Sequence, residues 1–280
     1  MISWARRIAA AAAAIAASMI LFSCSSGPEP PAKGTPAFYW DAAKQTFAGG
    51  DYVKALDHLD NIVATDNEYT AKARAWMLVM ESGMARGYME VADYFESGAR
   101  INKSDPTTFR KQVSQNRGLA GRLALRFADQ FGNFQKTKED PVLLAFPFPT
   151  GSLAPVLALT KVGNGILPQL NEVELAQRSA VSRSVVLATC RAAGNPDDAA
   201  KTQEMFKAGE VKVPRAVFVM TMAGALHDEA QLFTRNKQDE PDKLKIFCER
   251  AQEALKSIPE TKETKGLDAK IQATLKKNKT

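Results

Sequence analysis

The feature that most constrains this chain is a pattern of aromatic and apolar residues that repeats at helical spacing. Trp40 and Trp76 lie 36 residues apart, and the same separation joins Tyr52 to Tyr88. Along the chain, apolar side chains recur every three or four residues, and Asp, Asn, Gly and Pro interrupt them at regular intervals. A period of this length is typical of paired helices that bury their apolar faces against neighbouring pairs. The pattern therefore predicts an all-α protein.

The segment 50–59, GDYVKALDHL, carries a resemblance to a known repeat. Its Gly-Asp-Tyr start, Ala55 and Leu59 resemble the second half of a tetratricopeptide (TPR) repeat, and the Arg-Gly-Tyr of residues 86–88 begins a more degenerate copy. The resemblance covers about residues 36 to 101. It implies a TPR-like α-solenoid of antiparallel helix pairs, in which the first helix of each pair lines a concave groove.

Capping and helix-breaking residues predict where the individual helices begin and end. Helices are expected at 38–47, 52–64, 70–86, 88–101, 106–131, 172–192, 214–233, from 241 to just before Pro259, and 266–277. The mature chain then divides into N-terminal TPR-like repeats over 38–140, an irregular apolar connector over 141–168, and a C-terminal helical region with a TPR-like pair over 169–280.

The connector is the least regular part of the sequence. Residues 146–151, FPFPTG, predict a loop, because proline and glycine resist helix. An apolar helix is expected over 153–162, and the Gly-Asn-Gly of residues 163–165 ends it. We expect the connector to form a buried hairpin between the two helical halves. The alternative is an exposed apolar patch that binds a partner.

Three residues are candidates for partner binding through the resembled repeat. Trp40 and Lys44 fall on the turns of the first helix that face the groove, and Trp76 holds the equivalent place in the next copy. Aromatic side chains are effective anchors for a bound peptide or sugar. The alternative interpretation is that both tryptophans pack into neighbouring helices.

The N-terminus predicts export and lipidation. Arg6 and Arg7 precede an uncharged apolar run over residues 8–22, as in a secretory signal peptide. The Leu-Phe-Ser-Cys sequence that ends at Cys24 resembles the lipobox of bacterial lipoproteins, which implies a signal peptide over 1–23 and acyl chains, palmitate among them, on Cys24. One alternative is a membrane-spanning anchor, but at ~1.5 Å per residue the run is too short to cross the hydrocarbon core of a bilayer. The other alternative is ordinary secretion, in which Cys24 is a free thiol.

A tether follows the expected lipidation site. Residues 24–37 hold the cysteine and then four prolines and two glycines, a composition that behaves as an extended spacer. In the lipoproteins that this segment resembles, an Asp directly after the modified cysteine favours retention in the inner membrane. Ser25 stands at that position here, and the absence of an Asp favours the outer membrane. We therefore expect the protein in the cell envelope, on the periplasmic face of that membrane.

The distribution of charge argues against nucleic acid as a partner. The chain has a formal charge of +6, and removal of the two arginines in the signal leaves +4. Residues 261–280 carry six lysines against Glu263 and Asp268, which accounts for the same +4. The remaining body is close to neutral and lacks the basic face that nucleic-acid binding needs. The lysine-rich end is expected to be a solvated last helix, or a weak contact for anionic lipid or cell-wall polymer.

Cysteine and histidine content limits the chemistry. Cys190 and Cys248, both in expected helices, are candidates either for a disulfide in an oxidising compartment or for two buried, unpaired thiols. His58 is expected to pack or face solvent. His227 begins a His-Asp-Glu triplet, but neighbours one and two apart on a helix point in different directions. The sequence has no metal-ligand spacing, phosphate loop or catalytic triad, so we expect no metal, no cofactor besides the lipid, and no enzymatic activity.

These observations favour a membrane-anchored, non-enzymatic adaptor or scaffold that binds other envelope proteins. The principal alternative is a small-molecule-binding or transport accessory lipoprotein with a cavity between its helices. A further alternative is an envelope hydrolase that works through carboxylates alone.

Overall fold

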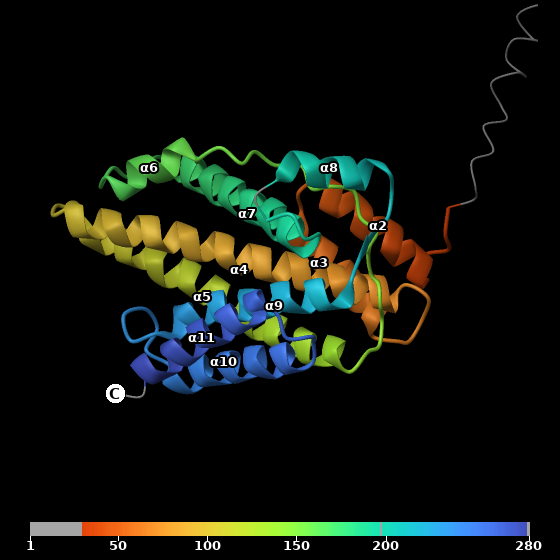
Figure 1. Ribbon diagram of the computed structural model, residues 1–280. Coiled ribbons are helices and arrows are strands. Elements are labelled where there is room, and N and C mark those ends of the chain that lie inside the picture. The colour runs from red at the N-terminus through yellow and green to blue at the C-terminus, as the bar shows by residue number, and fades with distance from the viewer. Residues whose placement is uncertain (1–29, 197, 279–280) are drawn as a thin grey trace, which may run out of the picture.

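Helices form almost all the regular structure of the computed structural model, which describes residues 30–196 and 198–278 (Figure 1). The helices are α2 (Pro36–Ala48), α3 (Tyr52–Val63), α4 (Thr70–Ile101), α5 (Pro106–Gln135), α6 (Leu157–Gly163), α7 (Leu170–Ala192), α8 (Ala199–Lys207), α9 (Arg215–Ala230), the short 3-10 helix η1 (Gln231–Phe233), α10 (Pro241–Lys256) and α11 (Lys262–Lys277). The prediction of an all-α protein is confirmed. The expected signal peptide, Cys24 and the first residues of the tether lie outside the described residues.

Side chains at the helix starts explain several of these boundaries. The Asp51 carboxylate caps α3 by accepting a hydrogen bond from the Lys54 amide at 3.3 Å. The Asp105 carboxylate caps α5 in the same way, by accepting a hydrogen bond from the Thr108 amide at 3.2 Å. Proline occupies the first turn of α2, α5 and α10, where its missing N–H costs nothing. These are the start signals that the sequence shows, so α3, α5 and α10 begin where they are expected.

The long helix α4 is the centre of the molecule. It lies beside α5 along most of its length, with α6 and α7 on one side and α9, α10 and α11 on the other, while α2, α3 and α8 gather at one end (Figure 1). Eighteen of its 32 residues are buried. No helix in the described ranges is both long enough and apolar enough to cross a membrane.

The prediction of two helices over 70–101 is wrong, because α4 runs through Gly87 without a break. This glycine serves close packing instead of a turn. A Cβ atom at Gly87 would lie 2.7 Å from the Val181 Cα of α7, and one at Gly83 would lie 2.8 Å from the Val185 Cα. The two glycines, one turn apart, thus let the backbones of α4 and α7 approach each other.

A continuous α4 also bears on the expected solenoid. The helices α2 and α3 pack against each other across a tight turn, in which Gly50 has a φ of 76°, and α9 packs against α10. The second N-terminal repeat, however, does not form a helix pair, since its two halves are one helix. The structure is all-helical, but a TPR-like solenoid is not confirmed.

The connector of residues 141–168 is partly core and partly exposed. Its strand β1 (Val142–Leu144) pairs antiparallel with β2 (Val211–Val213), a small sheet that the sequence analysis did not predict. Phe146 is 2 % exposed and stacks on Trp76 with ring centroids 4.9 Å apart. Leu157, by contrast, is 70 % exposed. The connector therefore contributes Phe146, Leu159 and Val162 to the core, whereas Leu157 and Ile166 present apolar side chains to solvent.

Candidate ligand cavity between helices α4, α7 and α9

The candidate groove residues do not form a groove. Trp76 is fully buried and Trp40 is 7 % exposed, and both rings contact Phe146, with centroids 4.9 and 4.8 Å away. Lys44 forms a surface ion pair with Asp41 at 2.8 Å. The expectation of an aromatic binding groove is therefore corrected: the two tryptophans are core residues, because α2 and α4 turn their apolar faces toward the connector.

The two cysteines of the described chain are free and buried, so the disulfide interpretation is also corrected. Cys190 lies on α7 and Cys248 on α10, and α9 packs against both helices. Burial raises the pKa of Cys248 to about 11 and raises that of Cys190 as well. Both side chains thus act as small apolar groups, as the second interpretation of the sequence had it.

The histidines have structural partners. The His58 ring lies against Tyr39 with centroids 6.2 Å apart, and His227 forms a hydrogen bond through Nε2 with the Thr274 hydroxyl at 2.9 Å. Within the described residues, no group of three or more His, Cys, Asp or Glu side chains is placed to hold a metal ion.

A cavity of about 560 Å³ lies where α9 faces α4, α7 and α11; we call it the α9 cavity. Most of its wall is apolar, and the principal apolar side chains are Ala188, Val217, Met220, Met222, Ala225 and Leu267. A neighbouring cavity of about 600 Å³ is also lined by residues of α4, α7 and α9. Arg86, Asp228 and Glu229 belong to the walls of both cavities.

An ion pair marks the boundary between the two cavities. The Arg86 guanidinium on α4 donates to the Asp228 carboxylate on α9 at 2.7 Å, and Arg191 on α7 approaches the same carboxylate oxygen at 3.6 Å. Asp228 is about half exposed, so solvent screens these pairs and they contribute little to stability. Their main effect is to connect the three helices that form the cavity.

Glu229, next along α9, has a very different environment. Its side chain is 2 % exposed, and neither carboxylate oxygen has a hydrogen-bond partner in the described part of the chain. Desolvation is the main cause that raises the pKa of Glu229 well above its usual range, and the negative charges of Glu81 and Asp228 add to the shift. A buried carboxyl group without a partner is costly, so it is an unusual component for a merely structural helix.

Glu81, the second buried acid, connects this site to the core. It is fully buried on α4, and one of its oxygens accepts a hydrogen bond from the Nε of Arg126 on α5. Arg126 also donates to Asp60 on α3 at 2.7 Å. Desolvation raises the pKa of Glu81 to about 7 despite the Arg126 charge. The other Glu81 oxygen has no hydrogen-bond partner among the described residues, so Arg126 satisfies only one of the two Glu81 oxygens.

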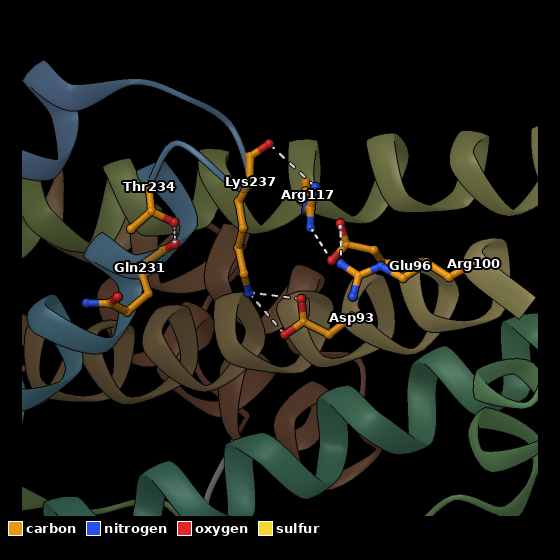
Figure 2. A network of polar contacts seen from close by, with 7 residues as sticks. All are labelled: Asp93, Glu96, Arg100, Arg117, Gln231, Thr234 and Lys237. Atoms are coloured by element: carbon orange, nitrogen blue, oxygen red, sulfur yellow. Dashed lines mark hydrogen bonds and ion pairs between the residues drawn. The ribbon is translucent and has the colours of Figure 1, made fainter. Parts of the chain in front are cut away.

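A polar network holds the turn after η1, which directly follows α9, against the neighbouring helices (Figure 2). Lys237, in the turn after η1, donates to both carboxylate oxygens of Asp93 on α4, at 2.9 and 3.0 Å. Arg117 on α5 binds Glu96 at 2.9 Å and reaches the Lys237 carbonyl at 3.4 Å (Figure 2). The turn that follows α9 and η1 is thereby held against both α4 and α5.

Sequence reasoning missed Glu81 and Glu229 as members of one site. Glu229 is part of the His-Asp-Glu triplet that the sequence shows, but its partners in space are not its sequence neighbours. One signal was present: Glu81 and Glu229 are acidic residues in otherwise apolar helical segments, AWMLVMESGMA and FVMTMAGALHDEA. Such residues are rarely buried without a reason.

No family model, no curated protein and no solved structure matches this chain. The fold and site define an all-α protein with a cavity between its helices.

Proposed function

We propose that this protein binds a small molecule in the α9 cavity. The observation that carries the proposal is the α9 cavity itself, which has a volume of about 560 Å³ and a mostly apolar wall that also holds Arg86, Arg191 and Asp228. Ligand sites are typically clefts of ~300–1,000 Å³, lined by apolar side chains with a few polar groups that orient the ligand. The α9 cavity has this size and this composition.

The alternative that the sequence analysis raised, a ligand-binding lipoprotein with a cavity between helices, thus has more support than a groove-based adaptor. The adaptor depended on Trp40 and Trp76, and both are core residues. We do not propose a catalytic role: the His227 ring is engaged in a hydrogen bond with Thr274.

Binding of a neutral apolar dye, Nile red, tests this function. We expect one saturable site per chain, followed by the increase in dye fluorescence. The variant Ala225→Phe places a larger side chain in the cavity wall and should remove that site. Ala269→Phe makes the same change at an exposed position of α11 and should leave binding intact. Equal dye binding by both variants would refute the proposal.

We also propose that the ligand-binding domain is held at the bacterial outer membrane by acyl chains on Cys24. Support comes from the lipobox-like sequence and from the Pro/Gly-rich segment that precedes α2. Metabolic labelling with radioactive palmitate should label the wild-type protein but not the Cys24→Ala variant. An unlabelled wild-type protein would contradict the anchor and leave the cavity proposal intact.

A second candidate function, docking to an envelope protein, is favoured by one observation. Among the described residues, five of the nine exposed large apolar side chains fall within residues 153–175: Leu153, Leu157, Ile166, Leu170 and Leu175. Exposed large apolar side chains are typical of partner contacts where they gather on one surface. A photo-crosslinking residue at Leu170 should capture one defined envelope protein in cells, whereas the same residue at exposed Lys245 on α10 should not. Crosslinks that do not depend on position would exclude this function.

A further inference from the structure

We propose that a cleft between α4, α5 and the turn after η1 binds a phosphate group, carried either by a small soluble molecule or by a lipid. We call it the α4–α5 cleft. It is a second site, because no residue lines both this cleft and the α9 cavity. The proposal rests on the charges of the cleft wall and on two basic side chains there that have no partner.

The α4–α5 cleft has a marked excess of positive charge. Its volume is about 730 Å³, within the range of ~300–1,000 Å³ that is typical of ligand sites. The charged side chains of its wall are five basic groups and one acid: Arg100, Lys103, Arg110, Arg117 and Lys237 against Glu96. Since the chain before its lysine-rich end is close to neutral, this concentration of basic groups is a local feature.

The acids near the cleft do not balance these charges. The Glu96 carboxylate lies between the guanidinium groups of Arg117 and Arg100, at 2.9 and 3.6 Å (Figure 2). Lys237 pairs with Asp93 at 2.9 Å, and Asp93 itself is not part of the wall. Even with Asp93 included, the five basic groups meet only two carboxylates, so an excess of three positive charges remains.

Lys103 and Arg110 are the basic groups without a partner. Both are exposed, and neither side chain forms an ion pair or a hydrogen bond with another described residue. Lys103 follows the C-terminal end of α4, where the helix dipole favours a basic group. Arg110 lies in the second turn of α5, toward the positive end of that helix, so the helix dipole does not account for it. A bound anion would pair with both side chains.

Arg117 supplies a fixed positive charge deeper in the cleft. It is 9 % exposed, and its two Nη atoms donate to Glu96 and to the Lys237 carbonyl. Its Nε atom is buried and has no partner in the described chain, so the contacts to a ligand fall to the exposed basic side chains. Because Arg117 is already held in place, a ligand does not have to order it, which lowers the cost of binding.

A phosphate group suits this wall better than a single carboxylate does. It carries a charge of about −1.5 to −2 and three acceptor oxygens, so basic side chains from both helices can donate to one group. Arginine binds phosphate through two parallel N–H donors, and the Ser114 hydroxyl of the wall adds a further donor. A cation would meet the excess positive charge, and the cleft leaves room for the body that carries the phosphate.

Isothermal titration calorimetry of the full chain with inorganic pyrophosphate tests the site. We expect one site per chain and an affinity that falls as sodium chloride is raised, because salt screens exposed charges. Tricarballylate carries a similar charge on three carboxylates. It should bind about tenfold more weakly than pyrophosphate, which corresponds to one hydrogen bond to a charged group.

Two double variants of equal charge locate the effect. Lys103→Gln with Arg110→Gln removes the unpartnered groups and should lower the pyrophosphate affinity at least about tenfold. Lys262→Gln with Lys276→Gln removes the same charge from α11 and should bind as the wild type does. All four positions are exposed, so both variants should fold, and circular dichroism checks that they do.

Dihexanoyl phosphatidic acid, a short-chain lipid that dissolves as a monomer, separates the two sources of phosphate. We expect it to compete with pyrophosphate. Tighter binding of the lipid supports a lipid headgroup as the ligand, and tighter binding of pyrophosphate supports a soluble phosphate compound.

Four results would overturn the phosphate site: no binding of either phosphate probe, equal binding of tricarballylate, full affinity in the cleft variant, or loss of affinity in the α11 variant. Nile red binding is measured at the α9 cavity, so the proposed function stands or falls separately from this cleft.

Discussion

Gly87→Ala is the substitution that tests the central helix contact most sharply. Alanine is a better helix former than glycine by about 1 kcal/mol, so a glycine-to-alanine substitution at an exposed position within a helix would stabilise the fold. At Gly87, however, the new Cβ would lie 2.7 Å from the Val181 Cα and 3.1 Å from its backbone N. Ordinary contacts between carbon atoms are ~3.5–4.0 Å, so α4 and α7 must separate by about 1 Å at this point.

The magnitude follows from two opposing effects. Overpacking of a close contact costs ~1–3 kcal/mol, and here the cost falls at the upper end because the obstructing atoms are backbone atoms that no rotamer change can move. After the gain of ~1 kcal/mol in helix propensity, we expect a net loss of about 2 kcal/mol. For a chain of this size that lowers Tm by roughly 4–8 °C.

Gly118→Ala provides a matched control. Gly118 lies within α5, and a Cβ there would meet only the Nη1 of the flexible Arg122 side chain, at 3.8 Å. We expect it to raise Tm by roughly 2–4 °C, through the propensity gain of ~1 kcal/mol alone. Calorimetric scans of the wild type and both variants measure the difference. If Gly87→Ala were as stable as Gly118→Ala, the close packing of α4 on α7 would be wrong.

Three further predictions concern the acids, the connector and the thiols. Burial raises the pKa of both Glu229 and Glu81, so the folded state keeps protons that the unfolded state releases above about pH 4.5. The free energy of unfolding should therefore fall as pH rises through about 7, and it should fall less steeply in Glu229→Gln. An identical slope in the variant would count against the buried acids. Phe146→Ala should lower the free energy of unfolding by ~3–5 kcal/mol in urea titrations, and a loss below about 1 kcal/mol would show that the connector does not close the core. Cys190 and Cys248 should resist a thiol reagent in the native protein and react after denaturation, and failure to react then would indicate a disulfide.

Much of the fold could be predicted from the sequence, because local signals determine it. Asp105 followed by proline marks the start of α5, Pro241 starts α10, and the apolar periodicity of residues 172–192 corresponds to most of α7. The prediction that the helix ends near Gly87 is wrong for a physical reason. A glycine at a turn and a glycine at a close helix contact look alike in sequence, and only the approach of α7 tells them apart.

The candidate site could not be predicted, because it is a product of the tertiary fold. Glu81 and Glu229 are 148 residues apart, and they act on one another only because α9 packs against α4. The tryptophans illustrate the same limit. Their spacing suggested a repeated surface, whereas the connector residue Phe146 covers both rings, and nothing local to either tryptophan indicates that contact.

The most direct test of the ligand cavity is nuclear magnetic resonance of the methionine methyl groups during titration with Nile red. Met220 lies in the wall of the α9 cavity, and Met77 is buried in the core away from it. The Met220 methyl signal should shift and saturate with the affinity that dye fluorescence gives, while the Met77 signal stays in place. An unchanged Met220 signal at saturating Nile red would contradict the account, as would a uniform shift of all methionine signals.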